Sequence, residues 1–480
     1  MQEKSYSYGD FSSSVVKIQQ YLKSTSEQYI GVITNDDLDT YSALLAILFS
    51  GKAFVPINPK NPAERNKSII EQAGISIILN SNTNEDPIDF HHAHCEIVKT
   101  DDFALSDKVI EVMEVPGERD AYILFTSGST GVPKGVPITR NSLFAFTEAF
   151  FALGYQVNEK DRFLQMFDLT FDLSIMSYFA PLCIGASILT VPAGEIKYSY
   201  VYRLLSAHKV TFALMVPSLL SYLRPFFREI NLPDLKYSLF CGEALYEDLV
   251  RDWKVCVPNA LIQNVYGPTE ATIFCLVYDI PENLDECKSQ NGIVCIGKPM
   301  INMGAVTIDD HKKINQNGEK GELCLYGAQV TNGYWKNEEK TREALFTDSL
   351  QGEQFTFYRT GDLCYLDEEL DFMYLGRLDH QVKIQGFRVE LSEIEHHVRE
   401  FTNLSNVAAI AYKNKFGSDL IHLYIDPYAG DKEELKKQLA SVLPQYMIPH
   451  KMTELDTFPL NVNGKIDRKE LKNRLETRKS

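Results

Sequence analysis

The sequence is poor in positive charge, and this deficit narrows the partners that the protein can have. Lys and Arg together number 48 against 65 Asp and Glu, which gives a formal net charge of -17 at pH 7. Nucleic acids and anionic membranes attract proteins through basic surfaces. Neither is therefore expected as a main partner, and a phosphate-bearing ligand would have to be held by a local feature of the chain.

Paired cysteines, a leader peptide and an uninterrupted hydrophobic span are also missing. The nine cysteines are scattered without a C-x-x-C pair, which favours buried free thiols in a cytoplasmic protein over disulfides. The opening MQEKSYSYGD lacks the apolar segment of a secretion signal. Residues 175–194 carry no charge, but Pro181, Gly185 and Pro192 interrupt them, so we expect a helix followed by a strand rather than a membrane span.

A short run of potential metal ligands lacks what a zinc site needs. His91, His92, His94 and Cys95 lie too close together in sequence to converge on one ion, and no second cluster completes the set. A polar loop or an edge strand is the expected structure there.

Apolar runs of strand length alternate with amphipathic helical patterns through most of the first 370 residues. Examples are YIGVIT (29–34), ISIIL (75–79), ASILTV (186–191) and TFALMV (211–216). Val/Ile/Leu-rich strands separated by helices indicate an α/β fold with parallel strands. A chain of 480 residues exceeds what one hydrophobic core usually covers, so at least two domains are expected.

The pattern changes near residue 376, where GRLDHQVKIQGFRVELSEIEHHVREF is dense in charge. Beyond it, a helix (LSEIEHHVREF), two strands (AAIAYK and LIHLYID) and a second helix (DKEELKKQLASVL) are expected, followed by a basic tail. We therefore predict a large N-terminal α/β domain at residues 1–378 and a small α+β domain at residues 379–480.

The stretch YILFTSGSTGVPKGVPITR (122–140) places a Thr-, Ser- and Gly-rich loop directly after a buried strand. It contains neither a Walker A sequence nor a G-x-G-x-x-G pattern. Its glycines nevertheless let backbone N–H groups face one point, which suits a polyphosphate placed between the strand and a following helix. A flexible linker is the alternative. The candidate contacts are Thr126, Ser127, Gly128, Ser129, Thr130, Gly131 and Lys134.

The loop TSGSTGVPKGV resembles the phosphate-loop motif of the adenylate-forming enzymes, which include acyl-CoA ligases and the adenylation domains of peptide synthetases. NVYGPTEAT (264–272) resembles their adenine and magnesium motif, and YRTGDL (358–363) their ribose motif. GRLDHQVKIQGFRVELSEIE (376–395) resembles the hinge segment of the family, and NVNGKIDR (461–468) resembles its catalytic-lysine motif. GKAFVPINPKNPAER (51–65) resembles an N-terminal structural motif of the family. Because these motifs follow the family order over nearly the whole chain, the chain is identified as a member.

The resemblance implies a reaction in two halves that uses ATP and Mg²⁺. A carboxylate attacks the α-phosphorus of ATP to give an acyl-adenylate and pyrophosphate, and a thiol then displaces AMP. Glu270 is implied to hold Mg²⁺, Thr269 to touch the α-phosphate, and Lys465 to reach the substrate carboxylate and the α-phosphate. The small domain is implied to move as a lid about a hinge at Asp379.

By the same resemblance, Tyr266 stacks on adenine, while Asp362 and Arg377 hold the ribose. Taken singly, Tyr266 could be a core residue and Glu270 a solvated carboxylate. Asp362 and Lys465 could be ordinary turn residues. The implied ATP-binding set is Thr126, Ser127, Gly128, Ser129, Thr130, Gly131, Lys134, Gly242, Glu243, Ala244, Asn264, Tyr266, Gly267, Thr269, Asp362, Arg377 and Lys465.

An acidic residue in FDLSIM (171–176) indicates the substrate class. In amino-acid-activating members, an Asp at the position of Asp172 pairs with the substrate α-ammonium, whereas ligases of plain acids generally lack it. A helix starting here places Asp172 and Met176 on one face. The alternative is that Asp172 caps this helix.

FDLSIM, LFCGEAL (239–245) and NVYGPTEAT together most resemble the D-alanine:carrier protein ligases. Phe274 departs from them, because they carry a small residue there, so the amino acid and its chirality stay open. The implied substrate pocket comprises Asp172, Leu173, Met176, Leu214, Leu239, Cys241, Val265, Ile273 and Phe274.

We predict activation of a small or compact apolar amino acid, such as alanine, and its transfer to the phosphopantetheine thiol of a separate carrier protein. The alternatives are a CoA ligase for a small carboxylic acid and a nucleotide-binding regulator that has lost catalysis.

Overall fold

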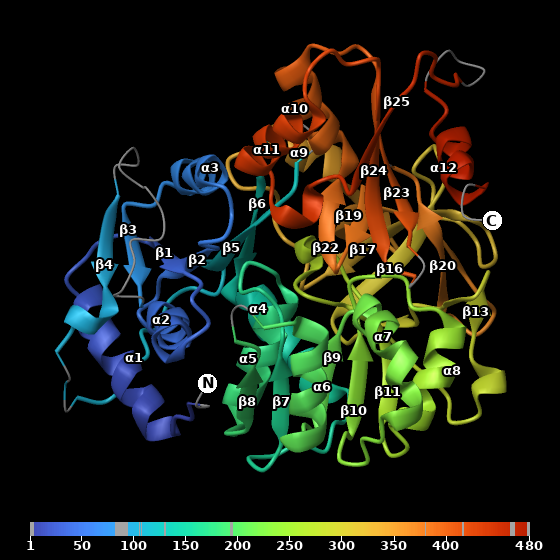
Figure 1. Ribbon diagram of the computed structural model, residues 1–480. Helices are drawn as coiled ribbons and strands as arrows, with labels where there is room; N and C mark the ends of the chain where they lie inside the picture. Colours follow the sequence, from blue (N-terminus) through green and yellow to red (C-terminus); the bar gives the residue numbers. More distant parts are fainter. Residues whose placement is uncertain are drawn as a thin grey trace.

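In the computed structural model the chain forms a large N-terminal body with a small C-terminal domain above it (Figure 1). The structure describes residues 4–81, 95–104, 106, 108–128, 131–192, 195–379, 381–414, 417–460 and 466–477. The predicted α/β class and the parallel-rich sheets are confirmed. The His91–His94 run lies outside the described residues.

The first sheet has six strands in the order β4-β3-β1-β2-β5-β6, all parallel except the last pair. Its strands are β1 (Tyr29–Ile33), β2 (Ala53–Ile57), β3 (Ile77–Asn80), β4 (Glu96–Lys99), β5 (Asp120–Thr126) and β6 (Lys134–Thr139). The helices of this part are α1 (Tyr8–Leu22), α2 (Leu38–Phe49) and α3 (Ala63–Ala73). Parallel neighbours need crossover segments, and α2 and α3 supply two of them.

The second sheet has seven strands in the order β15-β12-β11-β10-β9-β7-β8. Its strands are β7 (Arg162–Gln165), β8 (Ser187–Thr190), β9 (Phe212–Met215), β10 (Tyr237–Phe240), β11 (Leu261–Tyr266), β12 (Leu276–Asp279) and β15 (Lys298–Pro299). The helices are α4 (Arg140–Ala152), α5 (Leu173–Ile184), α6 (Lys197–Ala207), α7 (Pro217–Leu223) and α8 (Glu247–Cys256). The charge-free run 175–194 forms most of α5 and then β8, as the sequence predicted.

Residues 303–377 form a sheet of antiparallel strands, which differs from the parallel pattern expected for this part of the chain. A two-residue turn, Gln351 and Gly352, joins two of the strands, and both residues have positive φ. Such a turn can only connect antiparallel neighbours. The elements are β16 (Met303–Ile308), β17 (Gly321–Gly327), α9 (Glu338–Ala344), β18 (Leu345–Leu350), β19 (Glu353–Leu366) and β20 (Phe372–Arg377), after a small β13 (Ser289–Gln290) and β14 (Ile293–Val294) hairpin.

The small domain has the predicted α+β composition. A hairpin of β21 (Gln381–Ile384) and β22 (Phe387–Glu390) leads into α10 (Leu391–Thr402). The remaining elements are β23 (Val407–Lys413), β24 (Asp419–Ile425), α11 (Lys432–Val442), β25 (Lys451–Glu454) and α12 (Arg468–Thr477). Side chains of β23 alternate between the core under α10 and α11 and the core under α12, so the helices cover opposite faces of one sheet.

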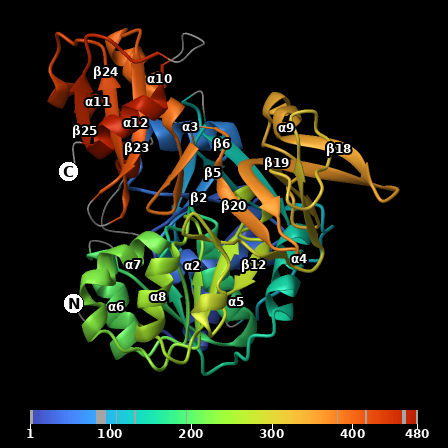
Figure 2. The same cartoon turned by 90° about the vertical axis from the view of Figure 1, so that its right-hand side faces the viewer.

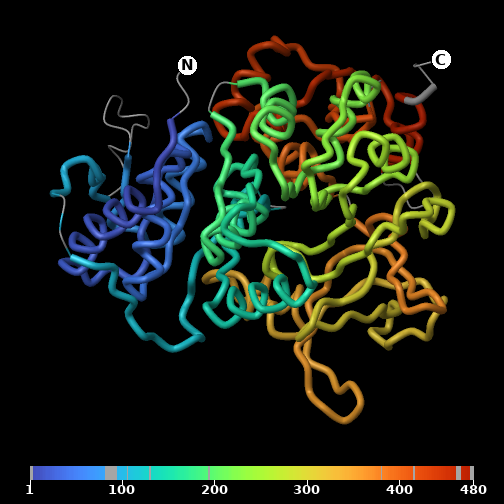
Figure 3. The backbone as a smooth tube through the Cα atoms, turned by 90° about the horizontal axis from the view of Figure 1, so that it is seen from below, coloured from blue at the N-terminus to red at the C-terminus, as the bar shows by residue number. Residues whose placement is uncertain are grey.

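The small domain lies over the end of the body that carries α3 and β6, and α11 contacts α3 (Figures 1 and 2). In the view from below, it lies at the opposite edge of the molecule from the projecting hairpin of β18 and β19 (Figure 3). None of the helices in the described residues is long and apolar enough to cross a membrane.

Candidate active site

The predicted phosphate loop joins two strands of a hairpin. The sequence suggested a loop between a strand and a helix, but β6 follows it, with Thr126 paired opposite Lys134, and α4 begins only after β6. A side chain at Gly128 would place a Cβ 2.0 Å from the carbonyl oxygen of Val132, and Gly131 has a φ of +81°. The tight return of the chain therefore requires these two glycines. Ser129 and Thr130 lie outside the described residues.

The donors of this loop face the small domain. The Ser127 hydroxyl donates to the carbonyl of Arg388 at 2.7 Å and accepts from the N–H of Glu390 at 3.3 Å. The N–H of Gly128 donates to the Glu393 carboxylate at 3.1 Å. The loop therefore presents hydrogen-bond donors, and one of them, the N–H of Gly128, is bonded to a carboxylate oxygen of Glu393.

Glu270 is fully buried at the centre of the site, in a short 3₁₀ turn (Thr269–Ala271). Arg388 donates to both of its carboxylate oxygens, at 2.8 and 2.7 Å, and the Tyr334 hydroxyl donates at 2.6 Å. Burial raises the pKa of Glu270, but Arg388 and Lys134 outweigh it and hold the pKa at about 2. The carboxylate is therefore ionised at neutral pH.

Glu270 fits Mg²⁺ as a single hard oxygen ligand. In the part of the chain that the structure describes, no group of three or more His, Cys, Asp or Glu side chains could hold a metal by itself. An ion here would thus need oxygens from the phosphates of a substrate to complete its shell.

The three residues predicted to bind the nucleoside come together. The Tyr266 hydroxyl donates to the Asp362 carboxylate, and the Arg377 guanidinium donates to the same carboxylate at 2.8 Å. Asp362 and Arg377 are register partners on β19 and β20. Arg377 also makes two hydrogen bonds of 2.7 Å to Asp379, so the nucleoside end of the site connects directly to the predicted hinge.

Two members of the predicted ATP-binding set serve other contacts in this structure. The Asn264 amide donates to the backbone carbonyl of Cys295 at 2.8 Å. The Glu243 carboxylate accepts from the N–H of Ser218 at 2.7 Å and from the N–H of Gly386 at 2.9 Å, so it connects the second sheet to the β21–β22 hairpin. Gly242 and Ala244 flank Glu243 in the turn after β10.

Asp172 is buried just before α5 and makes no capping hydrogen bond to that helix. Burial raises its pKa to about 6, partly offset by the hydroxyl of Thr269 and the charge of Lys383. Asp172 thus stands at the N-cap position of α5 without making the capping bond, and the helix group that stabilises its carboxylate is the N–H of Leu173.

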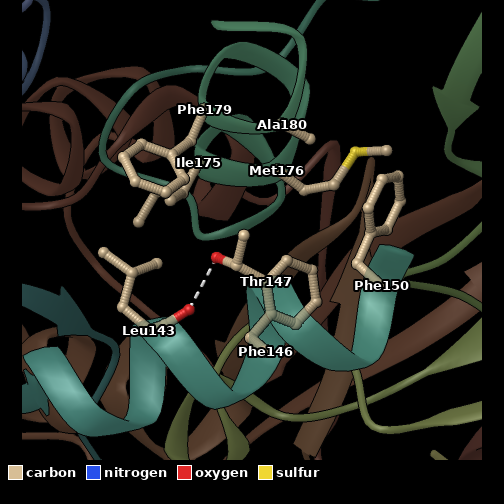
Figure 4. A pocket seen from close by; sticks show the side chains of 8 residues that line it. All are labelled: Leu143, Phe146, Thr147, Phe150, Ile175, Met176, Phe179 and Ala180. Atoms are coloured by element: carbon tan, nitrogen blue, oxygen red, sulfur yellow. Dashed lines mark hydrogen bonds between the residues drawn. The ribbon is translucent and has the colours of Figure 1, made fainter. Parts of the chain in front are cut away.

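The predicted pocket wall is apolar and closely packed. Phe274 packs edge to face against Phe146, with 5.1 Å between ring centroids. Figure 4 shows Met176 of α5 facing Phe146 and Phe150 of α4 across a hollow that has no room for a water molecule. The members that are 2% exposed or less are Leu173, Met176, Leu214, Leu239, Cys241, Val265, Ile273 and Phe274.

The turn between Glu270 and this wall is strained. Thr272 and Ile273 have φ values of 53° and 75°, which β-branched residues rarely adopt. The Thr272 hydroxyl donates to the carbonyl of Gln329 at 2.6 Å, and the close approach of Gly267 to Phe274 leaves no space for a Cβ. A constrained backbone thus fixes Glu270, the predicted Mg²⁺ ligand, relative to the predicted pocket.

Sequence reasoning missed four residues that contact the site: Tyr334, Arg388, Glu393 and Lys383. Arg388, Glu393 and Lys383 lie inside the segment that resembles the hinge motif. That resemblance gave no reason to expect Arg388 and Glu393 at the phosphate loop, or Lys383 near Asp172. Tyr334 lies in none of the recognised motifs, so nothing in the sequence indicated that it contacts Glu270. Lys465, the predicted catalytic lysine, lies outside the described residues.

Two α/β sheets, an antiparallel sheet and a small α+β domain over a glycine-rich phosphate loop define an adenylate-forming enzyme. Residues 1–335 match the family described as AMP-binding enzyme, and the chain belongs to that family. The resemblance read from the sequence is confirmed.

Curated relatives include both single ligases and much longer synthases. The D-alanine–D-alanyl carrier protein ligase of Bacillus licheniformis is 32% identical over 443 residues, covering 90% of this chain and 86% of that protein. Bacitracin synthase 3 of Bacillus licheniformis is 32% identical over 448 residues, or 93% of this chain. The chain spans only 7% of that synthase.

Solved structures share the fold over nearly the whole chain. The Vibrio cholerae adenylation domain AlmE, in complex with glycyl-adenosine-5'-phosphate, has a TM-score of 0.87 at 25% identity and covers 99% of this chain and 94% of its own. Holo-PA1221, a peptide synthetase protein with adenylation and carrier domains, has a TM-score of 0.85 at 25% identity and covers 97% and 79%.

Proposed function

We propose that the protein activates a small apolar amino acid with ATP to the aminoacyl-adenylate and passes it to the phosphopantetheine thiol of a carrier protein. The observation that carries the proposal is Asp172, a buried carboxylate at an apolar pocket that forms no salt bridge with any described residue, although the charge of Lys383 acts on it from farther away. Buried charges are normally paired. A substrate α-ammonium supplies the missing charge, which a plain carboxylic acid cannot do.

The phosphate end of the proposed reaction rests on Lys134, the loop donors and Glu270. Lys134 lies 5.1 Å over the Tyr334 ring and contributes its positive charge to Glu270. When bound, Mg²⁺ held by Glu270 and phosphate oxygens would neutralise charge on the phosphates. Loop N–H groups and hydroxyls fix the phosphates for attack by the substrate carboxylate at the α-phosphorus.

Pocket composition supports a small side chain. The wall that faces Asp172 offers no partner to a polar group, and leaving one unpaired costs roughly 1–3 kcal/mol. Phe274 fills the far end against Phe146. Glycyl-adenylate in AlmE and the alanine of the carrier protein ligase named above agree with a small substrate.

A groove between the two domains supports access by a thiol on a long arm. It has a volume of about 540 Å³ and lies between α7 and α8 of the body and the β23–β24 turn of the small domain. Tyr246 and Lys413 line it, and Lys413 interacts electrostatically with Glu243, which holds the Gly386 hairpin. The groove therefore borders the contact between the domains.

The two half-reactions require different positions of the small domain. Ile466, which follows Lys465, packs into the core under α12, on the opposite sheet face from the α10 helix that contacts the phosphate loop. We infer that residues 379–480 turn about Asp379 relative to residues 1–378 between the two half-reactions, and that the first of them uses Lys465, which lies outside the described residues.

Product analysis by mass spectrometry tests the proposal. The protein is incubated with ATP, Mg²⁺, a panel of amino acids and plain acids, and either a phosphopantetheinylated carrier protein or CoA. We expect aminoacyl-AMP from a small amino acid and a carrier mass increased by that aminoacyl group. Acyl-CoA formed from a plain acid, with no product from any amino acid, would contradict the proposal.

A further inference from the structure

Two side chains of the small domain bond to groups that we expect to bind the phosphates and the metal ion, namely the N–H of Gly128 and the carboxylate of Glu270. We propose that Glu393 and Arg388 take the places of the polyphosphate and its magnesium when the small domain is docked, and that Arg65 locks this state. Docking and Mg²⁺–polyphosphate binding then exclude each other. This inference rests on the proposed function, since it assigns the docked state to thiol transfer after pyrophosphate has left.

Glu393 meets the phosphate loop as an anion would. One carboxylate oxygen accepts the N–H of Gly128 at 3.1 Å, and the other pairs with Arg65 at 2.7 Å. Glu393 is 0% exposed and belongs to the small domain, whereas Arg65 lies on α3 of the body and its side chain is 5% exposed. The N–H of Gly128 cannot point at a phosphate oxygen while it donates to Glu393.

Arg388 meets Glu270 as a cation would. Its guanidinium donates to both oxygens of a carboxylate that is fully buried, and its backbone carbonyl accepts from Ser127. Mg²⁺ demands close, near-octahedral oxygen contacts, so it cannot share these oxygens with a guanidinium in the same place. Arg388 and Glu393 are five residues apart across the β22–α10 junction, so they arrive and leave together.

These contacts give the docked site a balance of charge without any nucleotide. Glu393 supplies the negative charge at the loop, and Arg388 supplies the positive charge at Glu270. Glu393 then depends on Arg65, because a buried charge that loses its partner is strongly destabilising. When the small domain is undocked, Glu393 leaves that buried position and no longer needs Arg65. Arg65 is therefore a positioning residue for the docked state alone.

Hydrogen–deuterium exchange tests the exclusion without requiring any substrate acid. In the wild-type protein we expect added Mg²⁺ and pyrophosphate to slow exchange in the β5–β6 hairpin and to speed it in α10. In Arg65→Gln, α10 should exchange faster before any pyrophosphate is added. Arg65→Lys, which keeps the charge, should recover part of the protection. The control is Lys437→Gln on α11, whose exposed pair with Glu434 lies away from the loop.

Activity measurements then separate the two half-reactions. We expect Arg65→Gln to slow thiol transfer from preformed adenylate by about 10-fold or more and to change pyrophosphate exchange by about twofold at most. Destabilisation of the whole protein by Arg65→Gln would instead show as faster hydrogen–deuterium exchange in β10 and β11 as well. Wild-type protection of α10 in Arg65→Gln, or joint protection of α10 and the hairpin by Mg²⁺ and pyrophosphate, would overturn the proposal. Because the hydrogen–deuterium exchange measurement needs no substrate acid, it tests the proposal even if the amino-acid assignment is wrong.

Discussion

At the scale of one residue, burial of the Asp172 carboxyl lowers the free energy of unfolding of the protein at neutral pH. Its pKa rises from 3.8 to about 6 on burial, so between these pH values the folded protein holds a proton that the unfolded chain has released. The free energy of unfolding therefore falls as pH rises through this window. At neutral pH the ionised carboxylate is buried without a direct salt bridge among the described residues, and we propose that the substrate α-ammonium provides one.

Replacing Asp172 by Asn should stabilise the protein and abolish amino acid binding. We expect a gain of about 1–3 kcal/mol in the free energy of unfolding at pH 7.5, which shrinks toward pH 4 where the wild-type carboxyl is protonated. Urea denaturation at both pH values measures it. A variant that is less stable than wild type at pH 7.5 would show that Asp172 has a structural partner.

The pH dependence of substrate affinity follows from the same carboxyl. Amino acid binding requires ionised Asp172, so KM for the amino acid should rise about tenfold for each unit that pH falls below about 6. KM for ATP should change far less in this range, because the role proposed for Asp172 concerns the amino acid alone. Steady-state kinetics between pH 5 and pH 8 check both expectations, and a flat amino acid KM would contradict the role of Asp172.

We expect Phe274 to limit the depth of the predicted pocket. Phe274→Ala removes a ring that packs against Phe146, so larger apolar amino acids should gain relative to alanine. Discrimination between substrates that differ by one methylene should stay loose, at about 1–3 kcal/mol. Pyrophosphate exchange over a series of amino acids measures the shift. An unchanged size preference would remove Phe274 from the pocket.

At the scale of elements, local patterns predicted structure where local physics decides it. β1, β8 and β9 lie within the apolar runs read from the sequence, and α10 and α11 begin within a residue of their expected starts. Two predictions were wrong: that the phosphate loop leads directly into a helix, and that the strands of residues 303–377 are parallel. Strand pairing depends on turns and partner strands, which apolar runs do not encode.

Contacts between elements far apart in sequence could not be predicted at all. The bond between Gly128 and Glu393 spans 265 residues, and it exists only because α10 docks on the β5–β6 hairpin. The family motifs grouped Asp362 with Arg377, and these two side chains do form a hydrogen bond, but the roles implied for them and for Glu270 stay predictions. The motifs did not show that Arg388 would contact Glu270.

Asp379 lies at the predicted boundary between the domains, where we expect the hinge. Its carboxylate holds Arg377 and accepts the N–H of Gln381 at 3.0 Å in the docked state. Asp379→Pro removes these contacts and fixes φ, so adenylation should survive while carrier loading falls steeply. Asp379→Ala is the control, since it loses the carboxylate but keeps backbone freedom. Equal loss of both steps in the Pro variant would point to misfolding.

At the scale of the whole molecule, one ligase must present two faces of its small domain to one site. Lys465→Ala should lower adenylate formation by about 100-fold or more, in line with the loss of one charge-stabilising group. Thiol transfer from preformed adenylate should be largely spared. Lys469→Ala is the matched control, because Lys469 is an exposed lysine in the same segment. Unimpaired pyrophosphate exchange in Lys465→Ala would contradict the assignment.

Amino-acid-dependent exchange of labelled pyrophosphate into ATP, measured over a panel of amino acids and plain acids, tests the central claim most directly. We predict exchange with small apolar amino acids, alanine among the first, and none with the matching acids that lack the amino group. Exchange only with plain acids would make the protein a CoA ligase. No exchange with any acid would mean that the family's chemistry has been lost and that the buried Asp172 serves no substrate.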